Sequence, residues 1–80
     1  DLKSYEYLCR ILVSEFGARP DAITPESTPA SVGLDSLSTA ELIREMEEEF
    51  GIVIPNEQAN FATLGEAAAI VDTLIEAEGI

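Results

Sequence analysis

Apolar residues recur every three or four positions in three stretches of the chain, a spacing typical of amphipathic helices. The spacing predicts helices over residues 3–16, 36–50 and 64 to about 78. Gly17 and Gly51 stand where the first two helices should end, because glycine readily adopts the left-handed conformation that closes a helix. The sequence therefore predicts an all-α fold, a small antiparallel bundle of three main helices.

The apolar faces of these helices are expected to pack together as a single core. Aromatic residues make up only 6% of the chain and tryptophan is absent, so the core must be aliphatic. Ser4 is placed to cap the first helix. The expected core residues are Tyr5, Leu8, Cys9, Leu12 and Phe16 in the first helix; Leu37, Ala40, Leu42, Ile43, Met46 and Phe50 in the second; and Leu64, Ala67, Ala68, Val71, Leu74 and Ile75 in the third.

A long loop is expected after the first helix, over residues 18–35. It contains three of the four prolines of the chain together with serine and threonine, which favour turns over helix. Loops of this length are uncommon in compact domains unless they carry function or local structure. The apolar residues expected to attach it to the core are Ile23, Val32 and Leu34.

The second connection is expected to contain one short helix. The apolar run at 52–54 has no partner strand elsewhere in the sequence, so it is predicted to be an extended connector and not part of a sheet. Asn56 is expected to cap a short helix over residues 57–62. Thr63 and Glu66 have the spacing of a capping box, in which each side chain satisfies a backbone donor of the other residue at the start of the last helix.

The chain is short and strongly acidic. Its 80 residues are expected to form one domain over residues 1–80, and an apolar content of 46% is enough for one core. Sixteen acidic residues face four basic ones, giving a net charge of −12. Such a surface repels phosphate backbones and anionic lipids, so neither nucleic-acid binding nor membrane insertion is expected. It favours association with basic patches on other proteins, and the alternative interpretation is that the surplus acid only keeps the domain soluble.

The single cysteine, Cys9, excludes a disulfide within the chain. The sequence shows no signal peptide and no apolar run of membrane-spanning length. These features favour a reducing compartment and predict a cytoplasmic protein, expected to be a monomer. The sequence opens on Asp1 and not on Met, which fits a segment excised or trimmed from a longer protein.

Ser36 stands at the predicted start of the second helix, within the run Gly33-Leu34-Asp35-Ser36-Leu37. Asp35 is placed to cap that helix, which leaves the Ser36 hydroxyl exposed in the first turn. Because the chain has no histidine, a serine nucleophile activated by a histidine base cannot be built from it. A helix start favours negative charge, so Ser36 is predicted to be modified by another protein with a phosphate-linked group. A plain helix start is the alternative interpretation of these residues alone.

The wider sequence resembles an acyl carrier protein. The matching runs are Gly-Leu-Asp-Ser-Leu at 33–37, Glu-Leu at 41–42, Glu-Glu-Glu-Phe-Gly-Ile at 47–52 and Ile-Pro at 54–55. The resemblance implies that a phosphopantetheinyl transferase moves 4′-phosphopantetheine from coenzyme A onto Ser36, with Asp35 and Leu37 as its neighbours in the site. The thiol of that arm would then carry acyl groups as thioesters.

The same resemblance implies partner enzymes and an acyl pocket. The helix over 36–50 would dock on basic patches of acyl transferases, ketosynthases or related enzymes of fatty-acid or polyketide synthesis. The apolar space between this helix and the short one would shelter the acyl chain, although ordinary core packing is the alternative interpretation of each residue there. The implied docking residues are Glu41, Arg44, Glu47 and Glu48, and the implied pocket residues are Leu42, Met46, Ile54, Ala59, Phe61 and Leu64.

Departures from the family pattern bear on which enzymes recognise the domain. Ser38 replaces an acid found in many fatty-acid carriers, and Ala40 replaces a frequent valine. Arg44 and Glu45 replace apolar or neutral residues, and Arg44 is expected to pair with glutamates three or four positions away. Peptidyl carriers more often have Gly-Gly before the motif and are less acidic, so an aminoacyl cargo is the alternative to an acyl or polyketide cargo.

Three other function classes share single features with this chain. Lipolytic hydrolases carry a Gly-Asp-Ser-Leu motif, but Leu34 interrupts it here and the histidine base is missing. A calcium loop needs spaced oxygen ligands that end on a distal glutamate, and because no segment supplies them no metal is expected. An acidic adaptor without a prosthetic group, or a nucleic-acid mimic that blocks a basic site, fits the charge, and only the context of Ser36 argues against it. The prediction is therefore a non-catalytic carrier.

Overall fold

The computed structural model describes residues 3–77, and all regular structure within them is helical. The elements are α1 (Lys3–Phe16), α2 (Ser36–Phe50) and α3 (Leu64–Ala77), with three 3₁₀ turns, η1 (Pro20–Ala22), η2 (Ala30–Val32) and η3 (Asn56–Gln58). The predicted all-α bundle with a long loop after the first helix is confirmed. The predicted end of the last helix, at about residue 78, lies outside the described residues.

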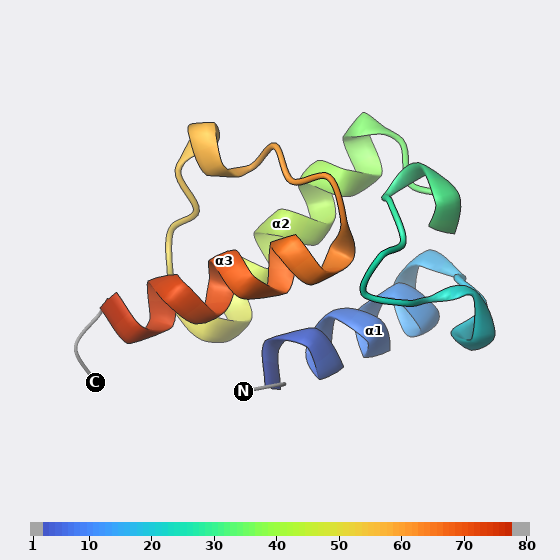
Figure 1. Cartoon of the computed structure of the whole chain (residues 1–80), viewed down its shortest axis with the longest axis horizontal. Coiled ribbons are helices and arrows are strands. Elements are labelled where there is room, and N and C mark those ends of the chain that lie inside the picture. The colour runs from blue at the N-terminus through green and yellow to red at the C-terminus, as the bar shows by residue number, and fades with distance from the viewer. Residues whose placement is uncertain (1–2, 78–80) are drawn as a thin grey trace.

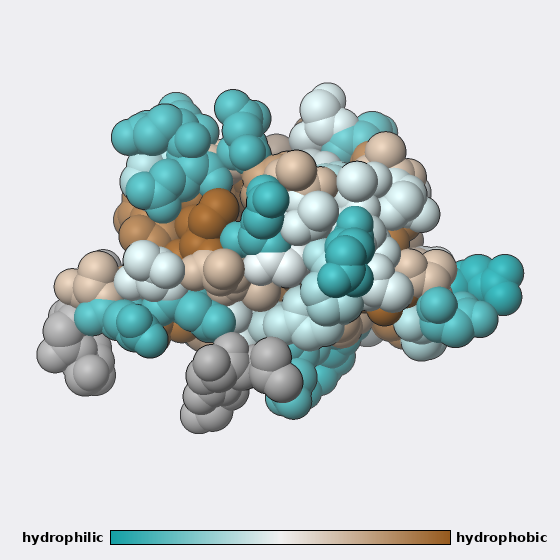
Figure 2. Space-filling model, viewed as in Figure 1, coloured by the Kyte–Doolittle hydropathy of each residue, from teal (hydrophilic) through white to brown (hydrophobic). Residues whose placement is uncertain are grey.

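α1 is the central helix of the bundle because it packs against both α2 and α3. In Figure 1, α3 lies in front and runs opposite to α1, while α2 crosses behind. The long loop lies at the end of the bundle where α1 ends and where α2 and α3 begin (Figure 1). On the face in view, hydrophobic surface gathers between the segment that holds η3 and α3 (Figure 2).

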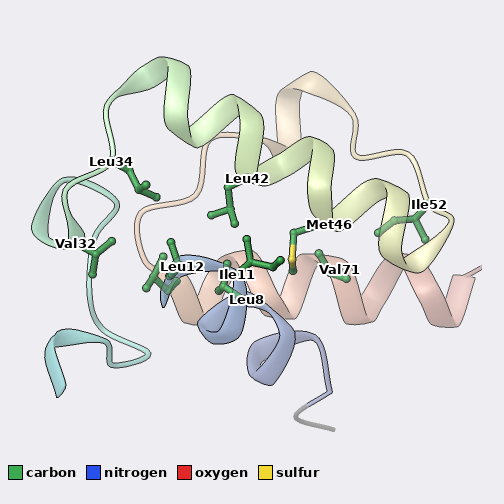
Figure 3. Close-up of a cluster of buried hydrophobic side chains, with 10 residues drawn as sticks. Leu8, Ile11, Leu12, Val32, Leu34, Leu42, Met46, Ile52 and Val71 are labelled. Carbon is green, nitrogen blue, oxygen red and sulfur yellow. The ribbon is translucent and has the colours of Figure 1, made fainter. Parts of the chain in front are cut away.

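The core is aliphatic, as predicted, and draws on all three helices and on the long loop. Figure 3 shows α1 side chains directed toward those of α2 and α3, with Val32 and Leu34 closing one end from the loop. Ile23 is half-buried against the same cluster, so the three predicted loop attachments are confirmed. The buried cluster consists of Leu8, Ile11, Leu12, Val32, Leu34, Leu42, Met46, Ile52, Leu64 and Val71.

Two predictions about the apolar faces were wrong. Leu37 is 69% exposed and Ala40 is also exposed, because the first turn of α2 stands clear of the other helices (Figure 1). In α1, Ile11 is buried although it was not predicted, whereas Cys9 is only half-buried. The faces are therefore rotated slightly from those that spacing alone predicts.

Ser4 is a buried hydroxyl inside α1 and not its cap. Its Oγ lies 3.1 Å from the Ala68 carbonyl oxygen and 2.5 Å from Asp72 Oδ1, both on α3. The side chain is fully buried, and these two α3 oxygens satisfy its hydroxyl. This polar contact joins α1 to α3 across the core. A second contact, between α1 and α2, is the edge-on packing of Tyr7 on Phe50 with ring centroids 5.5 Å apart.

The start of α3 is bonded to the long loop. The Leu64 N–H donates to the Ser27 carbonyl at 2.8 Å, and the Gly65 N–H donates to the Pro25 carbonyl at 2.8 Å. A Cβ at Gly65 would lie 3.0 Å from that same Pro25 oxygen, so any larger residue would push the loop away by a few tenths of an ångström. Two free donors of the helix start are thus satisfied by loop carbonyls.

The second connection contains a single turn, η3, in place of the predicted helix over residues 57–62. Pro55, and not Asn56, precedes that turn. Within residues 56–62 the half-buried apolar side chains are Ala59 and Phe61, too few to form the repeating apolar face of a helix, so the turn is not extended. The capping box is half confirmed: the Glu66 N–H donates to Thr63 Oγ1 at 3.2 Å, but the Glu66 carboxylate accepts the Ala62 N–H at 2.8 Å.

Candidate functional site

Ser36 is the first residue of α2, and its side chain is exposed. Asp35 is the N-cap, as predicted: its carboxylate accepts the Ser38 N–H at 2.8 Å, and its carbonyl accepts the Thr39 N–H at 2.9 Å. These bonds hold the turn through the residues on either side of Ser36. The Ser36 hydroxyl is therefore free to meet another molecule from solvent.

The charge of Asp35 is stabilised by the turn that it caps. The hydrogen bond from the Ser38 backbone N–H lowers the pKa of Asp35, and the Ser38 side chain lowers it further. The carboxylate therefore stays ionised at neutral and mildly acidic pH. The start of α2 carries one fixed negative charge next to the Ser36 hydroxyl.

The surface around Ser36 is open and partly apolar. A Cβ at Gly33 would meet no atom within 4 Å, so nothing crowds the approach from that side. Leu37 exposes its side chain directly after Ser36, while Leu34 is buried and fixes the preceding loop to the core. This arrangement presents a reachable hydroxyl beside an apolar contact point.

Leu37, Glu41, Arg44 and Glu48 form one exposed row along α2, here called the α2 stripe. They follow one another at spacings of three and four, which places them on one helix face. Arg44 makes none of its predicted pairs, since the ion pair found within residues 3–77 joins two loop side chains at 3.5 Å. Ion pairs between exposed side chains gain little free energy, which is why Arg44 and the nearby glutamates need not pair.

Glu47 differs from the other three charged residues predicted for docking. It is half-buried, and its Oε2 accepts the Ile54 N–H at 2.7 Å. Its main-chain carbonyl also accepts the N–H groups of Gly51 and Ile52, which follow α2. Glu47 is therefore bound to the segment after its own helix and is not part of the α2 stripe.

An apolar cavity lies between α2, α3 and the segment that holds η3, where hydrophobic surface shows in Figure 2. It offers about 10 Å³ to the centre of a water molecule, which is room for about one water. Its lining consists of Leu8, Leu42, Ile43, Met46, Ile54, Gln58, Phe61, Ala67, Ile70 and Val71.

Four of the six predicted pocket residues line this cavity, namely Leu42, Met46, Ile54 and Phe61. Ala59 and Leu64 do not, and Leu64 belongs to the main core. The sequence did not predict the lining residues of α3, which are Ala67, Ile70 and Val71, although their spacing places them on one face of that helix. No signal in the sequence says which helix face meets the segment with η3, because that contact joins distant parts of the chain.

The comparisons with known proteins agree with this geometry. The family model described as "Phosphopantetheine attachment site" matches residues 6–71. The chain belongs to the phosphopantetheine attachment-site family. Its prosthetic group is 4′-phosphopantetheine, as the resemblance to acyl carrier proteins implied.

One relative of this family member is "Acyl carrier protein 1, chloroplastic" of Casuarina glauca, 40% identical over 76 residues. The match covers 92% of this chain and 56% of that relative, so the chain spans little more than half the relative's length. The resemblance found in the sequence is thereby confirmed. Among the helices described in residues 3–77, none is long and apolar enough to cross a membrane.

Proposed function

We propose that Ser36 is the residue that carries 4′-phosphopantetheine. The observation that carries this proposal is the exposed hydroxyl at the first position of α2, held by hydrogen bonds that do not use it. The partial positive charge of a helix start favours a phosphodiester there. Asp35 already places one negative charge at this helix end, so the attached phosphate would share the favourable field with it.

The chain's own contribution to this attachment is the hydroxyl. In the reaction the Ser36 oxygen forms a bond to the phosphorus that bears pantetheine in coenzyme A, the pyrophosphate bond breaks, and adenosine 3′,5′-bisphosphate leaves. A phosphopantetheinyl transferase would supply the base that takes the hydroxyl proton, since this chain has no histidine. When attached, the group supplies a thiol on which acyl groups travel as thioesters. The domain would thus be a non-catalytic carrier.

The proposed cargo is an acyl chain, and the name of the relative, an acyl carrier protein, supports it. Fatty-acid synthesis is the proposed pathway, and polyketide or aminoacyl cargo would be the other outcomes. The cytoplasm is the proposed location, as the sequence predicts. The name of the relative places that protein in the chloroplast, so a plastid location is the alternative outcome. Mass analysis of the thioesters formed in the native cell extract would distinguish the cargoes.

The α2 stripe is the proposed docking surface for partner enzymes. Glu41 and Glu48 offer negative charge to a basic patch, and Leu37 offers an apolar anchor beside Ser36. Arg44 lies between the two acids, so a matching partner needs an acidic group opposite it. Acyl transferases and ketosynthases with such a patch are the proposed partners of a monomeric domain.

The apolar cavity is the proposed shelter for the acyl chain. Its lining by Leu42, Met46, Ile54 and Phe61 supports this role, because an alkyl chain gains free energy on leaving water for such a surface. Room for about one water is too small for a chain. Acyl binding therefore requires one wall of the cavity to move outward.

Attachment is tested by incubating the domain with coenzyme A, Mg²⁺ and a promiscuous phosphopantetheinyl transferase, followed by mass spectrometry. We expect one phosphopantetheine adduct, lost completely in Ser36→Ala because no other residue offers the same hydroxyl. Ser38→Ala is the matched control in the same turn and should keep the adduct. An adduct that persists in Ser36→Ala would contradict the assignment, and the absence of any adduct with several transferases would favour an acidic adaptor.

A further inference from the structure

The segment over residues 54–62, here called the outer wall, closes the cavity on one side. It contributes Ile54, Gln58 and Phe61 to the lining. Most of its side chains are exposed or half-buried, and its internal hydrogen bonds are the two short-range ones within and after η3. Figure 1 shows it as an arch that leaves α2 and returns to α3. Few buried contacts and exposed backbone make it the most easily displaced wall of the cavity.

Two carboxylates hold the ends of the outer wall to the flanking helices. Glu47 of α2 accepts the Ile54 N–H at 2.7 Å, and Glu66 of α3 accepts the Ala62 N–H at 2.8 Å. Within residues 3–77, these are the hydrogen bonds found between the backbone of the outer wall and a helix side chain. The backbone of the outer wall is therefore hydrogen-bonded to the flanking helices at its two ends, Ile54 and Ala62.

The Glu47 bond is the more protected of the two. It is partly buried, whereas the bond from Ala62 to Glu66 is exposed. A carboxylate acceptor makes a hydrogen bond about twice as strong as a neutral one, and partial burial reduces competition from water. Because Ile54 itself lines the cavity, this bond fixes a lining side chain and not merely a distant part of the loop.

We infer that Glu47 is a positioning residue of the acyl cavity: its carboxylate holds Ile54, and with it the outer wall, against α2. The inference deepens the proposed function, since it depends on a chain entering this cavity. An acyl chain needs the outer wall to move, and the Glu47 bond opposes that movement. Glu47 thus sets the cost of admitting a chain, while the exposed Glu41 and Glu48 remain available for docking.

The bond is tested first by amide hydrogen exchange, measured residue by residue with NMR on the unmodified domain. In Glu47→Ala, the Ile54 amide should exchange about tenfold faster or more, because a hydrogen bond to a charged group is lost. Glu47→Gln should restore much of the protection, since the amide oxygen still accepts. Glu49→Ala, an exposed neighbour on the same helix, is the matched control and should leave Ile54 unchanged.

Two results of this exchange experiment would overturn the inference. One is an Ile54 amide that exchanges equally in the wild type and in Glu47→Ala. The other is an equal rise at core amides such as Leu8 and Val71, which would show general destabilisation and no local role. Neither result depends on whether Ser36 is modified, so neither bears on the proposed function.

The effect on the cavity is tested by loading butyryl, octanoyl and dodecanoyl groups onto the phosphopantetheine form of each variant. The measured quantity is the Tm of the acylated form minus that of the unacylated form of the same variant, so that general stability cancels. With the wall released, the dodecanoyl group should raise the Tm of Glu47→Ala by about 4–8 °C more than that of the wild type. Glu47→Gln and Glu49→Ala should behave like the wild type.

The outcomes of this second measurement separate the inference from the proposal on which it rests. Equal acyl stabilisation in the wild type and in Glu47→Ala would overturn the role of Glu47 while leaving the cavity in place. No stabilisation by any chain in any variant would refute acyl shelter and, with it, this role. A Glu47→Gln variant that behaves like Glu47→Ala would point to the charge as such, and would also count against a hydrogen-bonding role.

Discussion

At the residue scale, the start of α2 separates two tasks between neighbouring side chains. Asp35 satisfies the backbone and carries the charge, so Ser36 needs no structural bond of its own. A serine at the cap position would have its hydroxyl engaged by the helix, and its modification would cost the cap. The placement of the acid one residue earlier makes the hydroxyl dispensable to the fold.

The cap can be tested through its charge. Asp35→Ala should lower the Tm at pH 7, and Asp35→Asn should lower it less because the amide oxygen still accepts the Ser38 N–H. Since the pKa of Asp35 is lowered in the folded state, its contribution is present above the unfolded value of about 3.9 and is lost as the pH falls through the folded value. The Tm difference between wild type and Asp35→Asn, followed by circular dichroism, should therefore shrink as the pH falls below about 3.9. A difference that stays constant or grows as the pH falls below that value would contradict this account.

Residue roles were predictable from sequence where they depend on near neighbours. The Asp35 cap follows from its position relative to Ser38, and the structure confirms it. The exposure of Leu37 and the burial of Ser4 were not predictable, because each depends on which helix face meets which neighbour. Apolar spacing fixes a face only to within about one residue.

At the element scale, the long loop and the start of α3 are held together at one end of the bundle, in a contact here called the joint. The loop carbonyls at Pro25 and Ser27 take the first donors of α3, and the close approach leaves no space beside Gly65. The joint fixes the start of α3 next to the loop that leads into Ser36. The turn that holds Ser36 is thus stabilised by a helix from later in the sequence.

Gly65→Ala tests this joint. A methyl group would lie 3.0 Å from the Pro25 oxygen and 3.2 Å from its Cβ, so the loop must shift. Overpacking of this kind costs about 1–3 kcal/mol, which exceeds the gain of about 1 kcal/mol from replacing glycine in a helix. Net destabilisation of up to about 2 kcal/mol is expected in urea unfolding.

Ala69→Gly, at an exposed site of the same helix, measures the propensity effect alone and serves as the control for Gly65→Ala. If Gly65→Ala proved more stable than the wild type, the close contact would not restrain the loop.

Among elements, the helix ends were predictable because Gly17 and Gly51 mark them locally. The walls of the cavity were not, since they join α2, α3 and the outer wall across long sequence separations.

At the scale of the whole molecule, part of the charge repulsion acts between helices. The chain has a net charge of −12, and the carboxylates of Glu15 in α1 and Glu45 in α2 repel each other. Glu15 raises the pKa of Glu45 by its charge, and burial adds to the effect. The total charge was predictable from composition, whereas the facing of these two acids required the packing of the helices.

Glu45→Gln should raise the Tm at pH 7 because it removes the repulsion from Glu15. A raised pKa means that the folded state binds the proton more tightly, so stability is lost as the pH rises from the unfolded value of about 4.3 through the folded one. The gain in Tm should therefore disappear below about pH 4. Glu41→Gln, which removes one charge from the exposed face, is the control and should give a smaller gain at pH 7. Equal gains from both would mean that only net charge matters.

The aromatic contact between α1 and α2 gives the molecule an internal optical probe. Tryptophan is absent, so ultraviolet emission comes from the two tyrosines, and one of them, Tyr7, lies edge-on against Phe50. Burial raises the pKa of Tyr5 to about 12 and also raises that of Tyr7. Both phenols thus keep their protons at a pH where free tyrosine has begun to lose its own, and the absorbance of tyrosinate would signal when α1 comes away from its neighbours.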